Sequence, residues 1–154
     1  MRWHPRVTVA AVIRDRLGRH LLVEEAPHGT PVLNQPAGHL EAGESLLDAV
    51  VREVREETCR EFTPEALLGV YRWQIPPDGD TYLRFCFVGA AGEERPELTR
   101  DPDILDVHWV AEEDLDRIGP ALRSPMVGLC IRDALAGQRY PLELLRDLVA
   151  EHDL

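Results

Sequence analysis

The feature that most constrains this chain is a helical segment, 45–58, whose acidic side chains border its apolar face. Side chains follow one another by about 100° around an α-helix. On that spacing three carboxylates share an arc of about 100°, and they belong to Glu53, Glu56 and Glu57. The arc lies beside an aliphatic stripe formed by Leu47, Val50, Val51 and Val54. The acidic side chains therefore adjoin the future core and do not lie opposite it.

Such a cluster is unfavourable unless something compensates its charge. Like charges within one helical turn repel and raise one another's pKa values. A hard divalent cation removes this repulsion, and magnesium prefers carboxylate, carbonyl and water oxygens. Gly38 lies in the loop 36–44 before the helix, where a glycine lets the backbone approach a metal or a phosphate closely. The alternative interpretation is a solvated helix face on which Arg52 and Glu56 form a surface pair.

The charge of the chain restricts what it can bind. Its 17 basic residues are all arginine, and its 28 acidic residues bring the net charge to −11. An acidic chain is unsuited to binding a nucleic-acid polymer. The absence of lysine excludes a Walker-type phosphate loop and Schiff-base chemistry. A phosphate compound that binds here must therefore be bridged to the carboxylates by a divalent cation.

Length and cysteine content define the broad class. The 154 residues fit a single domain, 1–154, and no apolar run approaches the length of a membrane span. Cys59, Cys86 and Cys130 are widely spaced and form no CxxC pair, which is typical of reduced thiols. We therefore expect a cytoplasmic monomer with a small-molecule substrate and no membrane partner.

The rest of the pattern predicts an α+β fold. Strands are expected at 6–14, 21–25, 32–35, 67–74, 82–89 and 107–110. Helices are expected at 45–58, 112–118, 124–136 and 142–150. The first two strands are expected to pair as a hairpin around the turn 15–19. Because strands and helices alternate irregularly, a layered sandwich is favoured over a doubly wound parallel sheet.

The spacing around the acidic helix is specific. It reads glycine, five residues, glutamate, seven residues, then Arg-Glu-aliphatic-x-Glu-Glu, and it is formed by Gly38, Glu44, Arg52, Glu53, Val54, Glu56 and Glu57. This pattern resembles the box of the Nudix hydrolases. Four further segments resemble phosphatases of that family, namely 34–41, 83–85, 123–127 and 137–143. Cys59 and Arg60 depart from the box, because the family usually has glycine and an aliphatic residue there.

The resemblance implies the Nudix α/β/α sandwich with a mixed sheet, in which the box forms a loop, a helix and a loop. It implies a magnesium-dependent phosphohydrolase, with Mn²⁺ as a substitute, that releases phosphate from nucleoside tri- and diphosphates and from hydroxymethylpyrimidine pyrophosphate. The candidate metal ligands are the Gly38 carbonyl, Glu53, Glu56 and Glu57. Arg52 is expected to orient these glutamates, and Glu44 to bind metal through water or to support the loop.

The general base and the substrate contacts are less constrained. The base is either a box glutamate or Asp103, which lies six residues before Trp109, where family members often carry a functional acid. An ordinary loop aspartate is the alternative for Asp103. Candidate contacts to a base or phosphate are His39, Trp73, Tyr82, Arg84 and Tyr140, with structural packing as the alternative for each aromatic ring. Trp109 is expected in the core.

Two other functions compete with a nucleotide phosphatase. A non-catalytic Nudix-fold binding module tends to lose box glutamates, and all of them are present here. A pyrophosphohydrolase that removes oxidised nucleotides has the same fold and metal site but releases pyrophosphate. Attack at a terminal phosphorus rests on the resemblance alone.

Overall fold

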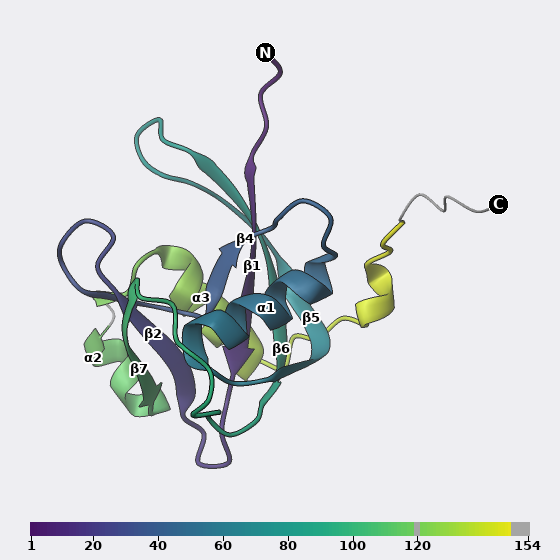
Figure 1. The fold of residues 1–154 in the computed structure, drawn as a ribbon. Coiled ribbons are helices and arrows are strands. Elements are labelled where there is room, and N and C mark those ends of the chain that lie inside the picture. Colours follow the sequence, from purple (N-terminus) through teal and green to yellow (C-terminus); the bar gives the residue numbers. More distant parts are fainter. Residues whose placement is uncertain (119–120, 149–154) are drawn as a thin grey trace.

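The strands of this chain form two sheets (Figure 1) in a computed structural model that describes residues 1–118 and 121–148. One sheet has the order β4-β1-β6-β5, with β1 Arg6–Ile13, β4 Ala37–His39, β5 Phe62–Gln74 and β6 Thr81–Ala91. The other has the order β3-β2-β7, with β2 His20–Glu25, β3 Val32–Asn34 and β7 Ile104–Val110. Strands β1 and β6 are parallel and their other neighbours antiparallel, so the larger sheet is mixed, as predicted.

Helices cover both faces of the larger sheet. The helical segments are α1 Leu46–Thr58, η1 Glu112–Asp114, α2 Leu115–Ile118, α3 Pro125–Leu135 and η3 Leu142–Leu144. Val50 and Val54 of α1 pack into one core with Phe87 of β6. On the opposite face Cys130 of α3 packs against Cys86 of the same strand. The layers therefore form the expected α/β/α sandwich.

Strand β1 lies at the centre of this arrangement. Val9 and Ile13 enter the core under α1, whereas Ala10 and Val12 enter the core under α3. A strand that is buried on both faces has no polar side to alternate with. This is why the first strand is apolar at nearly every position.

Helix α1 begins and ends at identifiable residues. Ser45 accepts a hydrogen bond from the backbone N–H of Asp48 at 3.0 Å, which confirms the predicted cap. The helix ends at Cys59, whose φ of 58° lies in the left-handed region that favours glycine. The Cys59 side chain is buried, and its sulfur lies 3.6 Å from the carbonyl oxygen of Leu98. Cys59 thus adopts the conformation for which the family uses glycine.

Two predicted elements are wrong. Strands β1 and β2 share only the isolated bridge between Arg14 and His20 and belong to different sheets, because β4 and β6 already occupy both edges of β1. The helix expected at 142–150 is only the 3-10 turn η3, which buries none of its residues. The last two positions of that prediction, 149 and 150, lie outside the described residues.

Two boundaries also differ from the sequence expectation. The loop 36–44 contains the short edge strand β4, which pairs with β1 over three residues. Strand β5 begins at Phe62, five residues before its predicted start at Leu67, because register shifts near Pro64 and Leu67 interrupt its alternation. The helices predicted at 112–118 and 124–136 are present as η1 with α2, and as α3.

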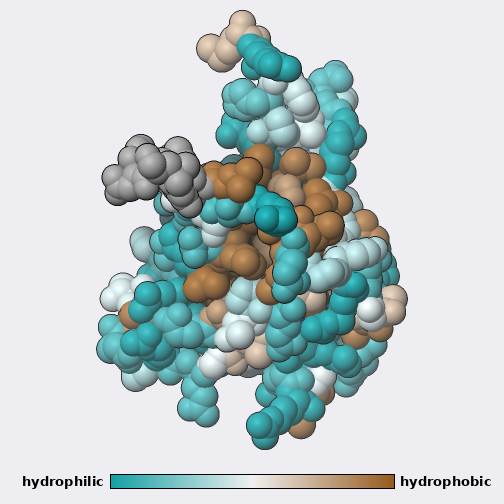
Figure 2. Space-filling model, turned by 90° about the vertical axis from the view of Figure 1, so that its right-hand side faces the viewer, coloured by the Kyte–Doolittle hydropathy of each residue, from teal (hydrophilic) through white to brown (hydrophobic). Residues whose placement is uncertain are grey.

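The cysteines and the molecular surface were also the subject of expectations from the sequence. The three cysteines are free thiols, as predicted, and all three are buried. No helix in the described part of the chain is both long and apolar enough to span a membrane. Apolar side chains gather on the side of the molecule where β5 and the C-terminal segment lie (Figure 2), and the exposed ones include Val70 and Leu144.

Candidate active site

Arg52 of α1 connects the carboxylates of the box. It donates two hydrogen bonds to Glu44, at 2.9 and 2.7 Å, and one each to Glu53 and Glu56, at 2.8 and 3.2 Å. It also donates to the backbone carbonyl of His39 at 3.0 Å. The hydrogen bond from Arg52 lowers the pKa of Glu44. Arg52 therefore ties the loop before the helix to the acidic arc, as its expected orienting role requires.

Glu57 is the most deeply buried of the helix acids. Only 7% of the residue is exposed, and its carboxylate accepts the backbone N–H of Ala37 at 2.8 Å. The pKa of Glu57 is raised to about 9, mainly by burial, and the negative charges of Glu53, Glu25 and Asp101 contribute in the same direction. The ionised form of Glu57 is therefore unfavourable in the metal-free protein.

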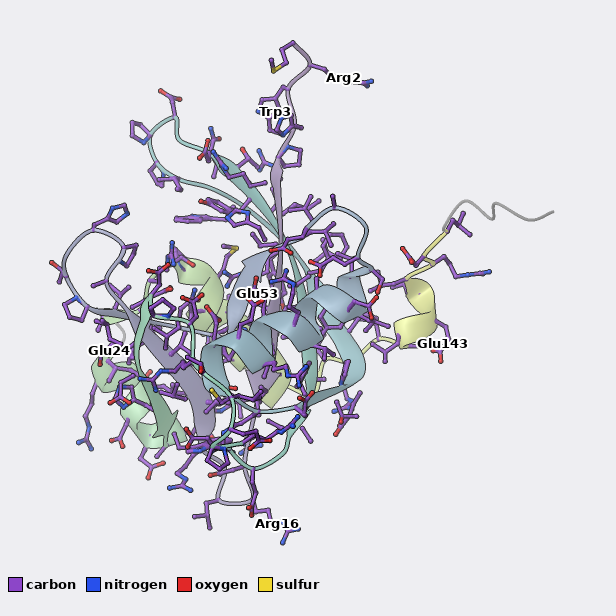
Figure 3. The ribbon with its side chains drawn as sticks, in the orientation of Figure 1. Arg2, Trp3, Arg16, Glu24, Glu53 and Glu143 are labelled. Carbon is purple, nitrogen blue, oxygen red and sulfur yellow. The ribbon has the colours of Figure 1, made fainter. Side chains whose placement is uncertain are left out.

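Glu53 lies directly against the edge strand. Figure 3 shows this residue on the side of α1 that faces β4. Gly38 of β4 pairs with Val9 and so faces α1, and a Cβ atom at Gly38 would overlap the Glu53 carboxylate. A side chain here would force the Glu53 carboxylate to move, so close approach favours glycine at this position, with no need of an unusual φ. Burial raises the pKa of Glu53 to about 7.

The charges of these residues suit a divalent cation, although their carboxylates are not arranged as a complete set of metal ligands. Among the described residues, no three His, Cys, Asp or Glu side chains converge into a formed metal cage. Arg52 holds the carboxylates of Glu53 and Glu56, whereas the Ala37 amide holds that of Glu57. The carboxyls of Glu57, which is buried, and Glu53, which is partly buried, nevertheless lie one helical turn apart with raised pKa values. A hard cation with oxygen ligands offsets that penalty.

Asp101 approaches the helix more closely than the predicted Asp103. The N–H of Asp101 donates to the carbonyl of Glu56 at 2.8 Å, and its charge acts on Glu57. Asp103 is exposed, and its N–H donates to the Asp101 side chain at 2.9 Å. Sequence reasoning overlooked Asp101 because nothing in the acidic loop distinguishes it from its neighbours.

Three of the predicted substrate contacts form a row of rings. The His39 and Tyr82 rings lie 6.3 Å apart, and those of Tyr82 and Trp73 are stacked at 6.4 Å. The row begins at His39, whose backbone carbonyl accepts a hydrogen bond from Arg52, and it continues from there away from the box. Tyr140 is not part of it, because its backbone pairs with Leu67 of β5, at the sheet edge opposite β4.

Two other predicted side chains are more enclosed. Arg84 of β6 is 6% exposed and donates to the side chain of Gln35 at 2.9 Å. Trp109 packs against the core under α1, as expected, and Arg60 lies over its ring at 5.3 Å. Arg60, which departs from the box pattern, therefore covers an indole face, an arrangement that favours arginine.

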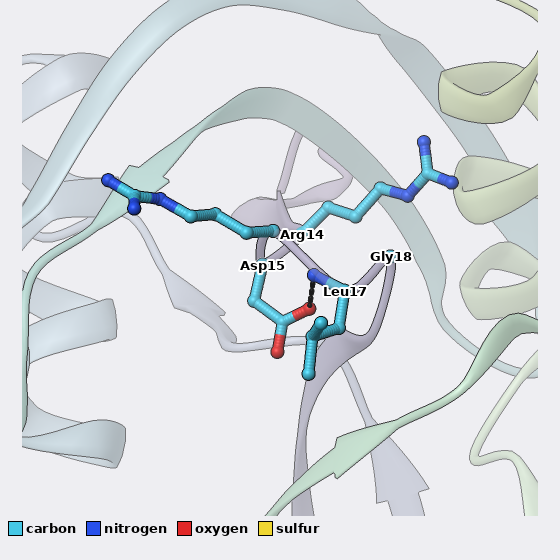
Figure 4. A pocket seen from close by; sticks show the side chains of 5 residues that line it. Arg14, Asp15, Leu17 and Gly18 are labelled. Carbon is cyan, nitrogen blue, oxygen red and sulfur yellow. Dashed lines mark hydrogen bonds between the residues drawn. The ribbon is translucent and has the colours of Figure 1, made fainter.

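A hollow of about 450 Å³ lies at the β1–β2 turn and is lined by residues 14–18 (Figure 4). Asp15 stabilises this turn by accepting the N–H groups of Leu17 and Arg19 at 3.0 and 2.8 Å. The turn follows the end of β1 that lies beyond its pairing with β4. We assign the hollow to the turn itself and not to the site.

Comparison with known proteins gives the family context of this geometry. A model of the NUDIX domain matches residues 4–127. Phosphatase NudJ of Escherichia coli (strain K12) is 42% identical over 143 residues, which cover 93% of this chain and 92% of that protein. The NudJ phosphatase of Shigella sonnei matches at the same identity and coverage.

Solved structures agree with this family at the level of the fold. A NUDIX hydrolase from Nitrosomonas europaea superposes with a TM-score of 0.90 at 46% identity, covering 94% of this chain and 98% of its own. A bifunctional NMN adenylyltransferase/ADP-ribose pyrophosphatase from Francisella tularensis, complexed with AMP and a manganese ion, gives a TM-score of 0.65 at 20% identity. It covers 87% of this chain and 42% of its own length, and it supports the fold alone.

Proposed function

This chain belongs to the Nudix hydrolase family, and from that premise we propose that it releases inorganic phosphate from nucleoside tri- and diphosphates with the help of Mg²⁺. Its general activity, phosphoanhydride hydrolysis, follows from the family and from the NudJ phosphatases. Hydroxymethylpyrimidine pyrophosphate belongs to the same proposal, as a second substrate.

One observation carries the proposal at the level of the site. Glu57 is buried and Glu53 is partly buried one helical turn before it, with pKa values raised to about 9 and 7 by burial. A binding module without chemistry has no need for such a pair, because buried carboxylates destabilise the fold unless a cation neutralises them. The pair is therefore best explained as a site kept for a metal.

We assign Glu53, Glu56, Glu57 and the Gly38 carbonyl to Mg²⁺, with Mn²⁺ as a substitute. When bound, such an ion neutralises phosphate oxygens and acidifies water. Arg52 positions Glu53 and Glu56, and Glu44 holds Arg52 in place through two hydrogen bonds.

The general base is assigned to the acidic loop before β7. Asp101 is the stronger candidate, because its backbone is anchored to the C-terminal turn of α1 at Glu56. Asp103, the acid expected from the sequence, is exposed and supports the same turn through its N–H. A carboxylate there can accept a proton from the attacking water beside the box.

The ring row of His39, Tyr82 and Trp73 is proposed to receive the leaving end of the substrate. Tyr82 and Trp73 are partly buried and stacked, and we assign a planar base of the substrate to these rings. Stacking depends little on which base is bound. A row of this kind is therefore compatible with substrates that differ in their base.

The deciding experiment follows the products from a nucleoside triphosphate in ¹⁸O-labelled water with Mg²⁺. Terminal attack predicts nucleoside diphosphate first and monophosphate later, with labelled inorganic phosphate at each step. Pyrophosphate released together with monophosphate as the first products would reject terminal attack and favour a pyrophosphohydrolase. Hydroxymethylpyrimidine pyrophosphate is assayed in parallel for phosphate release.

The metal assignment is tested with Glu56→Gln and Glu57→Gln. Each change removes one anionic oxygen ligand with little change of shape, and turnover is expected to fall by about a hundredfold or more. Glu113→Gln is the matched control, because Glu113 is exposed on η1, away from the box. Turnover near that of the wild type in both box variants would refute the assignment.

A further inference from the structure

A buried guanidinium lies on the α3 side of the larger sheet without a counter-ion. Arg84 of β6 is 6% exposed, and NH1 donates to Oε1 of Gln35 at 2.9 Å. Its Nε atom is buried without any hydrogen-bond partner, and no carboxylate forms an ion pair with it among residues 1–118 and 121–148. Burial lowers the pKa of Arg84.

The groups near Arg84 whose negative charge would offset its own are Cys130, Cys86 and Glu25. The nearby carboxylate of Glu25 already pairs with Arg123 and accepts from Asn34. Gln35 is neutral, and its amide nitrogen is used by the carbonyl of Ala11 and the sulfur of Cys86. A buried charge without compensation is strongly unfavourable. The fold therefore retains a buried cation for which residues 1–118 and 121–148 supply no carboxylate partner.

A second unpaired polar atom lies beside it. Thr8 of β1 is the strand neighbour of Arg84, and its hydroxyl is also buried without a partner. On its other side Thr8 pairs with His39 of β4, the first residue of the ring row. Tyr82 precedes Arg84 by two residues on β6 and so lies on the same face. Arg84 and Thr8 thus form a polar floor beside the rings.

We propose that Arg84, together with the Thr8 hydroxyl, binds an oxygen of the part of the substrate that is not transferred. The chemistry required is an acceptor oxygen, either of the phosphate that stays with the product or of a carbonyl group on the base. This inference rests on the proposed function, because it takes the substrate to be a nucleotide. Side chains above the floor must shift when the substrate enters, as interface side chains commonly do.

The test uses Arg84→Gln, which removes the charge and keeps a donor for Gln35. The inhibition constants of a nucleoside monophosphate and of the matching nucleoside are measured against triphosphate hydrolysis. Arg72→Gln is the control, because Arg72 is exposed on the adjacent strand β5 and pairs there with Leu83. A rise of about tenfold or more in the inhibition constant of the monophosphate is expected, since truncation of a buried charged contact weakens binding by this much or more.

The two inhibition constants together identify the group that Arg84 binds. A rise for the monophosphate alone identifies the retained phosphate as the bound group, whereas an equal rise for the nucleoside identifies the base carbonyl. If the inhibition constant rises for neither compound, the proposal is overturned. The order of phosphate and pyrophosphate release is read separately in the same enzyme, so failure of the proposed function is distinguishable from failure of this inference.

Thermal unfolding without ligand provides an independent readout. A purely structural arginine stabilises the fold, so its loss would lower Tm. An arginine kept for binding is expected to give the opposite sign, with Tm of Arg84→Gln equal to or above that of the wild type. Thr8→Val keeps the shape of the side chain and removes the unpaired hydroxyl, and it is expected to raise both Tm and the inhibition constant. A lower Tm in both variants, with unchanged inhibition constants, would leave only a structural role and overturn the proposal.

Discussion

The buried carboxyl of Glu57 makes the stability of the metal-free protein depend on pH. Its pKa is raised from 4.5 to about 9, mainly by burial. Between these values the folded state holds a proton that the unfolded chain releases, so stability falls as pH rises. Below pH 4.5 both states are protonated and the loss disappears. The substitution Glu57→Gln removes this dependence, because an amide of nearly the same shape does not ionise.

The size of the effect follows from the same values. Each pH unit between the two pKa values changes the free energy of unfolding by about 1.4 kcal/mol. At pH 7 the loss attributable to Glu57 is therefore about 3 kcal/mol. In a chain of this length that corresponds to roughly 6–12 °C in Tm. The glutamine can still accept the N–H of Ala37, so the hydrogen bond itself need not be lost.

The assay is thermal unfolding of both proteins in EDTA from pH 4.5 to pH 8. We expect equal Tm values near pH 4.5 and a Glu57→Gln variant that becomes progressively more stable toward pH 7. Glu56→Gln is the control, because the side chain of Glu56 is 48% exposed and its curve is expected to follow the wild type. Added Mg²⁺ is expected to raise the Tm of the wild type more than that of Glu57→Gln. Parallel curves for the wild type and Glu57→Gln in EDTA would refute the reasoning.

Three further experiments test the surroundings of the helix. Gly38→Ala is expected to reduce turnover at least about tenfold, because its Cβ overlaps the Glu53 carboxylate and forces that carboxylate to move. Steady-state kinetics measure the loss, and turnover equal to that of the wild type would contradict the close approach. Cys59→Gly is expected to be more stable than Cys59→Ala by about 1 kcal/mol, with turnover unchanged, since only glycine relieves the left-handed φ. Equal unfolding midpoints would exclude strain there. Asp101→Asn is expected to lower kcat more than Asp103→Asn, and the reverse order would return the role of base to Asp103.

Local sequence pattern was sufficient for the helix and for the arrangement of its carboxylates. The arc of Glu53, Glu56 and Glu57 depends only on the helical repeat, and the Ser45 cap on a side chain three residues from its partner. The need for glycine at Gly38 was expected, but its cause was not. Close approach by Glu53 is a contact between a strand and a helix that are 15 positions apart in sequence, and no local pattern reports it.

Contacts between distant segments account for what the sequence did not predict. Whether β1 and β2 pair as a hairpin depends on β4 and β6, which occupy the edges of β1 from later in the chain. The position of Asp101 depends on a backbone hydrogen bond to Glu56, 45 residues earlier. The missing ion pair of Arg84 is visible only once the sheet is folded. Composition and periodicity carry no information about such partners.

Helix α1 can carry unfavourable charges because its stability comes from elsewhere. Its cap at Ser45 and its buried Ala49, Val50 and Val54 hold it against the sheet regardless of how the acids ionise. The apolar stripe also determines where the acidic arc points, since the two lie side by side on one helix. Packing therefore holds the Glu57 carboxylate where water cannot solvate its charge. Only a proton or a cation can neutralise the carboxylate there. The same burial that destabilises the metal-free protein at neutral pH thus provides the driving force for metal binding.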